Sequence, residues 1–296
     1  MSLFGDRYTR SGPGIAKNAP KKKPFFLFWE IYFRKFWKML QLNIITFIFC
    51  MPIVTIGPAL TGMTKVLRNY SLEKNAFVFH DFWKGFSSNL KKSIPMGLLD
   101  ILAVVSAFCS VYVYTAMGDN AESGGWFYYA LCAISLSVVF VFLMMNFYAY
   151  PMIAATELTF KNVLKNSFIL AAVALKKNII TLLAVALVVA ILVITALLNV
   201  YMLIFLVALW ALTFIGFIIV FNCYPQIQKY VINPYYEEKG MDNPEYDYLK
   251  PMSAEDSIFT DKGGEETPVE PESDKKSKNK DKSGSGGGKG KGKIIS

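Results

Sequence analysis

Few residues of this chain have the type and spacing that chemistry requires, and Asp100 is the foremost of them. It is the only acidic residue in the run 93–118, which is otherwise uncharged and long enough to cross a membrane as a helix. A carboxylate within a membrane is costly, so it marks a candidate functional site, for example one that couples to a proton or a cation. The alternative is that Asp100 lies near the membrane surface, where water or a lysine compensates its charge.

The sequence does not predict an enzyme. His80 is the only histidine, and no pair of acids and no nucleophile beside a base has the spacing that catalysis or metal binding needs. We therefore expect no catalytic residue, no metal site and no cofactor, and we expect His80 to be a surface residue.

Three other candidate residues lie in the uncharged run 39–64. Asn43 can bind a ligand or form hydrogen bonds between helices, and the second role is the more common one for an asparagine in a membrane helix. The same holds for Asn146 in a later run. Gly57 and Pro58 break the helical pattern, so they either line a substrate path in a broken helix or form a tight structural turn.

The elements that position these residues are long apolar runs. Residues 178–228 contain no charged residue and no histidine; as one helix they would extend about 77 Å, against a hydrocarbon core of about 30 Å. The run must fold back, and Asn199 is the natural turn. Together with the runs 39–64, 93–118 and 123–156, this predicts an all-α fold: a polytopic membrane helix bundle of about five transmembrane helices.

Two shorter segments have the pattern of amphipathic helices. Apolar residues recur at three- and four-residue steps in residues 25–40 and again in 79–90, which predicts helices that lie at the membrane–water interface. The ends of the chain have a different composition. Residues 1–24 form a basic arm and residues 251–296 a low-complexity tail, and both are expected to be disordered around a helical membrane domain at 25–250.

The distribution of lysine and arginine predicts the orientation of the helices. Loops 65–92 and 157–177 carry six and four basic residues, so both are expected on the cytoplasmic side, together with the C-terminal tail. The run 39–64 leaves two alternatives open: it crosses the membrane, or it re-enters and returns to the same side at its Pro52 and Gly57–Pro58 breaks. Pro52 resembles the prolines that close two later runs, which favours a crossing.

The segment Thr55-Ile56-Gly57-Pro58-Ala59 resembles a motif of the YesL family, small multi-pass membrane proteins of Gram-positive bacteria that form a domain of unknown function. The resemblance covers roughly residues 28–235. It includes Asn43 near the start of the first run, the aromatic segment 81–86 and the basic pair Lys91-Lys92. Family members often sit beside genes for sugar-uptake transporters, and the resemblance implies a similar setting here. The resemblance implies no catalytic residue for this chain.

These observations predict a protein of the cell membrane that acts as a non-enzymatic accessory or interaction component linked to carbohydrate uptake. The expected partners are the lipid bilayer and a sugar ABC transporter or another membrane protein, with no specific nucleic acid, and the sequence leaves room for an oligomer. The alternative is a small secondary transporter or a channel-like oligomer with Asp100 near its path.

Overall fold

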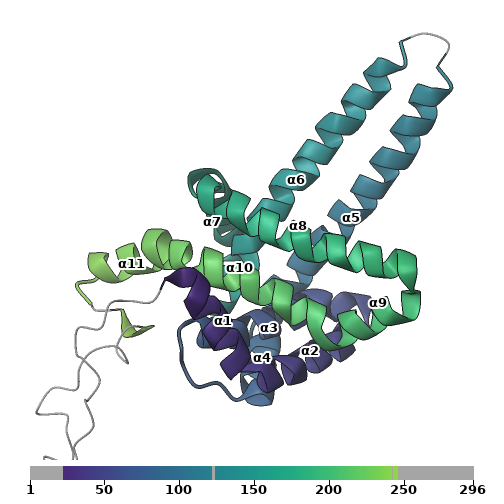
Figure 1. Cartoon of the computed structure of the whole chain (residues 1–296). Helices are drawn as coiled ribbons and strands as arrows, with labels where there is room; N and C mark the ends of the chain where they lie inside the picture. Colours follow the sequence, from purple (N-terminus) through teal and green to yellow (C-terminus); the bar gives the residue numbers. More distant parts are fainter. Residues whose placement is uncertain (1–22, 122–123, 242, 246–296) are drawn as a thin grey trace, which may run out of the picture. The chain divides into compact units, whose positions relative to one another are not determined.

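The computed structural model describes residues 23–121, 124–241 and 243–245, and within these ranges every regular element is helical. The chain divides into two compact units at Pro244, and the description below concerns the first. Its elements, in order, are α1 (Pro24–Arg34), α2 (Phe36–Cys50), a 3₁₀ turn (Ile53–Thr55), α3 (Ile56–Ser71), α4 (Val78–Ser88), α5 (Leu90–Asp119), α6 (Trp126–Ala155), α7 (Phe160–Val173), α8 (Leu175–Leu198), α9 (Val200–Leu206), a π turn (Val207–Ala211), α10 (Leu212–Ile227), a second π turn (Gln228–Ile232) and α11 (Asn233–Glu238) (Figure 1). The all-α fold class is confirmed.

Four of these helices are long and apolar enough to cross a membrane: α5, α6, α8 and the continuous helix Val200–Glu238 that contains α9, α10 and α11. The uncharged run 178–228 folds back at Asn199, as predicted. The Asn199 side chain accepts hydrogen bonds from the backbone N–H groups of Tyr201 at 2.9 Å and Met202 at 3.3 Å. This is the N-cap that a new helix needs, so the turn residue also starts α9.

The predicted span 39–64 is not a single helix. Helix α2 has 15 residues, about 22 Å of helix, which is shorter than the hydrocarbon core of about 30 Å. After the turn that contains Pro52, α3 runs back beside α2. Arg34 forms an ion pair of 2.9 Å with Glu73, and the Lys35 ammonium lies 5.8 Å from the centre of the Tyr70 ring. The start of α2 therefore meets the end of α3, as the re-entrant alternative requires and a crossing does not.

The two amphipathic segments pack on protein rather than only on the membrane surface. In α4, Phe82 and Phe86 are buried, and a Cβ on Gly85 would lie 2.9 Å from the Cα of Gly62 in α3. In α1, the Phe28 ring stacks on Phe217 of α10 with centroids 4.8 Å apart. The interfacial interpretation holds only for the aromatic side chains that these helices leave exposed: Phe25, Phe33, Phe79 and Trp83.

The buried core surrounds α3, which contacts α2, α4, α5, α6 and α10. Helices α5 and α6 form a long hairpin, and Figure 1 shows that its outer half extends away from the helices around α3. In α5 the buried residues are Ser93, Met96 and Gly97 near its start and Gly118 near its end. The predicted N-terminal arm lies outside the described residues up to residue 22, and the predicted tail 251–296 lies outside them entirely.

Candidate functional site: an apolar cavity around Asp100

Five helices enclose a cavity of about 500 Å³ beside Asp100. Its walls come from α3, α5, α6, α8 and α10, and almost all of the lining side chains are apolar. Representative wall residues from the five helices are Met63, Ala103, Phe142, Val185 and Ile219. The volume falls within the range of roughly 300–1,000 Å³ that small-molecule sites occupy, and such sites are typically apolar with a few fixed polar groups.

The polar groups of the cavity lie together at one place. Asn146 and Tyr150 are four residues apart on α6, so they project from the same face of that helix toward Asp100 on α5. The Asn146 amide nitrogen donates to one carboxylate oxygen of Asp100 at 2.6 Å, and the Tyr150 hydroxyl donates to the other. Two hydrogen bonds from α6 therefore hold the carboxylate in position.

Not every acceptor in this polar group of side chains has a hydrogen-bond donor as its partner among the described residues. The side-chain oxygen of Asn146 is buried and has no hydrogen-bond partner within the described ranges. The hydroxyl of Thr64, the remaining polar lining residue, donates to the carbonyl of Leu60 at 2.7 Å. Among the described residues, no lysine, arginine or histidine forms an ion pair with Asp100. The site can therefore accept hydrogen bonds and compensate a positive charge.

Asn43 has a different environment, because its hydrogen-bonding capacity is used within the protein. Its side-chain nitrogen donates to the carbonyl oxygens of Val207 at 2.8 Å and Ala208 at 2.7 Å. Its side-chain oxygen accepts from the backbone N–H of Thr213 at 2.8 Å and from the Thr213 hydroxyl at 3.1 Å. An asparagine has two donors and one oxygen with two lone pairs, so Asn43 has nothing left for a ligand. It connects α2 to the π turn before α10.

Gly57 and Pro58 lie in the first turn of α3, and both are buried. A Cβ on Gly57 would lie 2.0 Å from the carbonyl oxygen of Ser93, and a Cβ on Gly97 would lie 2.7 Å from the nitrogen of Gly57. The backbones of α3 and α5 therefore touch at two glycines, as small residues allow between membrane helices. The Thr61 and Ser93 hydroxyls, 2.8 Å apart, add a hydrogen bond at this contact. Neither Gly57 nor Pro58 lines the cavity; other residues of α3 do.

The sequence did not predict Tyr150 as a partner of Asp100. For Asn146 it favoured a hydrogen bond between helices over ligand binding, and Asn146 does form such a bond, from α6 to Asp100 of α5. Both residues are polar, and they stand four positions apart in a helix that contains no charged residue. That spacing was a usable signal, since it predicts one polar patch on one face of α6. The spacing does not predict the register of α5 against α6, which brings Asp100 to this patch.

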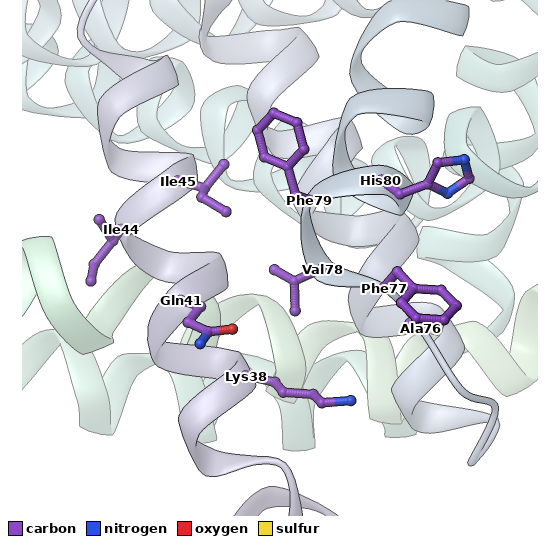
Figure 2. A pocket seen from close by; sticks show the side chains of 9 residues that line it. All are labelled: Lys38, Gln41, Ile44, Ile45, Ala76, Phe77, Val78, Phe79 and His80. Carbon is purple, nitrogen blue, oxygen red and sulfur yellow. The ribbon is translucent and has the colours of Figure 1, made fainter.

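A second hollow lies at the surface. An open groove of about 670 Å³ lies between α2 and the start of α4 with the residues just before it. Figure 2 shows Ile45 and Val78 on its two sides. Its polar side chains, Lys38, Gln41 and His80, belong to exposed residues, and the exposure of His80 is as predicted. The groove contains no buried polar group that could fix the orientation of a ligand, so the cavity around Asp100 is the stronger candidate.

Residues 42–111 match the model of a protein family of unknown function, DUF624. No curated protein and no solved structure matches the chain. The matched segment runs from α2 into α5 and includes Asn43, Gly57, Pro58 and Asp100, whereas Asn146 and Tyr150 lie beyond it. The chain is thus similar, over this segment, to a family of unknown function, and its four long apolar helices are those of an integral membrane protein.

Proposed function

We propose that the protein is a non-enzymatic accessory component of a cell-membrane assembly linked to carbohydrate uptake. The observation that carries the proposal is the exposure of the α5–α6 hairpin. In the most apolar stretch of each helix only 11% of the residues are buried within the chain. A long hairpin with so few buried residues offers an apolar surface for lipid and for another membrane protein.

The link to carbohydrate uptake rests on the resemblance to the YesL family of Gram-positive bacteria, whose members often sit beside genes for sugar-uptake transporters. The partner we propose is therefore a membrane subunit of a sugar ABC transporter. The proposed orientation follows from charge: the basic loops before α5 and α8 lie in the cytoplasm, and four crossings then return the C-terminal tail to the same side.

The accessory role can be tested by site-specific photocrosslinking in native membranes. A photoreactive amino acid replaces Tyr112, which is 79% exposed on the outer half of α5, and in a control variant it replaces Phe205 on α9. We expect the Tyr112 position to give a protein adduct that contains a sugar-transporter subunit, in higher yield than the Phe205 position. Adducts with lipid alone at Tyr112 would contradict the accessory role.

A second function, a small secondary transporter or channel-like oligomer, is favoured by the cavity around Asp100. Here the test is flux into proteoliposomes that contain only the purified protein. A transporter of this kind gives a proton- or cation-dependent flux that Asp100→Asn abolishes. The accessory role predicts no such flux from the wild-type protein.

A further inference from the structure

The cavity around Asp100 has a chemical preference that goes beyond either proposed role. We propose that it binds an amphiphilic organic cation: an ammonium or related N–H donor attached to an apolar chain or ring system. The inference concerns the cavity alone and does not depend on the accessory role, because purified protein without any partner should show the binding.

The polar end of the cavity selects the head group. Asp100 brings a carboxylate to this end, and one N–H of Asn146 and the Tyr150 hydroxyl are directed at it. The Asn146 oxygen beside them is buried and has no partner within the described ranges. A carboxylate has about four lone-pair sites and receives two hydrogen bonds here, so a ligand that brings donors suits this end of the cavity. Since no basic side chain in the described ranges pairs with Asp100, a positive charge on the ligand would also compensate the carboxylate.

The apolar walls exclude a simple metal ion as the preferred occupant. Calcium takes six to eight oxygen ligands, and magnesium takes six. The side chains of the lining offer oxygen atoms only from Asp100, Asn146, Tyr150 and Thr64, of which the first three lie together, and the other lining side chains are apolar. An anionic amphiphile is disfavoured by the same carboxylate that attracts a cation. An apolar body attached to an ammonium group is complementary to both parts of the cavity.

The way into the cavity also fits a ligand that dissolves in the bilayer. Phe108 of α5 lines the cavity and is 74% exposed, and the lining residues Val104 and Leu143 are exposed as well. These three side chains belong to the α5–α6 hairpin, on surface that meets lipid in a membrane. The cavity therefore opens sideways toward the hydrocarbon, and an amphiphile can enter without crossing the aqueous phase.

The test uses the full-length protein in nanodiscs of zwitterionic lipid and three probes with the same alkyl chain: dodecylamine, dodecanol and dodecanoate. Saturable binding of radiolabelled dodecylamine is measured, and the other two probes serve as competitors. A charge-assisted hydrogen bond is worth about a tenfold difference in affinity or more over a neutral contact. We expect dodecylamine to bind at least about tenfold more tightly than dodecanol, and dodecanoate not to compete.

Substitutions test whether dodecylamine binds in the cavity around Asp100. Asp100→Asn should lower the affinity for dodecylamine about tenfold or more, to the level of the alcohol, whereas Asp119→Asn, an acid of the same helix outside the cavity, should leave it unchanged. Ala103→Phe places a ring in the cavity and should abolish saturable binding of both probes. Equal affinity for the amine, the alcohol and the carboxylate in the wild-type protein would overturn the proposal. Because that comparison uses only the wild-type protein, it does not depend on whether a variant folds. Equal affinity of the wild type and of Asp100→Asn for dodecylamine would also overturn the proposal.

Discussion

Asn43 allows a sharp test of how the first helical hairpin is attached to the rest of the protein. Its side chain makes four hydrogen bonds to backbone and hydroxyl groups around the π turn Val207–Ala211. A π turn shifts the hydrogen-bond ladder of a helix. The Asn43 side chain supplies partners at the start of this turn and just beyond its end. The substitution Asn43→Ala removes all four bonds without adding volume.

The expected loss of stability follows from these contacts. Interhelical hydrogen bonds in membrane proteins contribute about 0.6 kcal/mol each on average, so the four bonds together are worth about 2 to 3 kcal/mol. The N–H of Thr213 becomes a buried donor without its present acceptor, and an unsatisfied donor of this kind costs roughly 1–3 kcal/mol. We expect Asn43→Ala to lower the free energy of unfolding by about 3 to 6 kcal/mol in total.

The measurement is reversible unfolding in mixed micelles by titration with a denaturing detergent. The matched control is Asn120→Ala, because Asn120 is exposed and donates only to Ala116 at the end of its own helix. The control should change the free energy of unfolding by less than about 0.5 kcal/mol. If both variants lose the same stability, Asn43 does not connect α2 to α10. Its four hydrogen bonds would then contribute less to the free energy of unfolding than we expect.

Three further predictions test the hairpin of α2 and α3 and its surroundings. Single cysteines at Phe26 and Asp119, in a background without native cysteines, should react with an impermeant thiol reagent from opposite sides of the membrane; labelling from the same side would mean that residues 39–64 cross it. Gly57→Leu should destabilise the protein by about 3 kcal/mol or more in the same unfolding assay, since its Cβ would overlap the backbone of α5, whereas Leu102→Ala on an exposed face of α5 should cost less than about 0.5 kcal/mol. Burial, and secondly the nearby charge of Asp81, raise the pKa of Tyr70 to about 12. The neutral phenol is thus favoured in the folded state, so its contribution to stability is complete below pH 10 and is lost between pH 10 and 12. Tyr70→Phe should remove this part of the pH dependence and should not lower stability at pH 7, because the buried hydroxyl has no hydrogen-bond partner among the described residues; an unchanged profile would contradict the assignment.

The long helices could be predicted from the sequence because the membrane imposes a simple rule. A run with no charged residue must satisfy its backbone internally, which requires helices of about 20 residues. The run 178–228 follows the rule closely, and Asn199 marks its turn because an asparagine can cap the next helix. Composition and length are sufficient for this part of the fold.

The run 39–64 shows where the rule stops. Its length and lack of charge fit a crossing helix as well as they fit a hairpin of two short ones, and Pro52 breaks a helix in either case. The contacts that decide between the two, from Arg34 to Glu73 and from Asn43 to Val207, join residues that are 39 and 164 positions apart. Hydropathy does not contain such pairings, so the sequence left both alternatives open, and the position of Pro52 favoured the crossing, which the contacts of α2 and α3 do not support.

Polar residues within the apolar helices differ in one property that the sequence does not reveal: how much of their hydrogen-bonding capacity the fold uses. Asn43 uses its full capacity on the α10 side of the bundle. Asn178 is similarly engaged, since it accepts from the Tyr148 hydroxyl and donates to the carbonyl of Ala171 at 2.8 Å. Such residues hold helices together. Asn146, the neighbour of Asp100, instead keeps a buried oxygen without a partner among the described residues, and both residues line a cavity. An unsatisfied buried group is costly, and this is one reason for our proposal that the cavity binds a ligand.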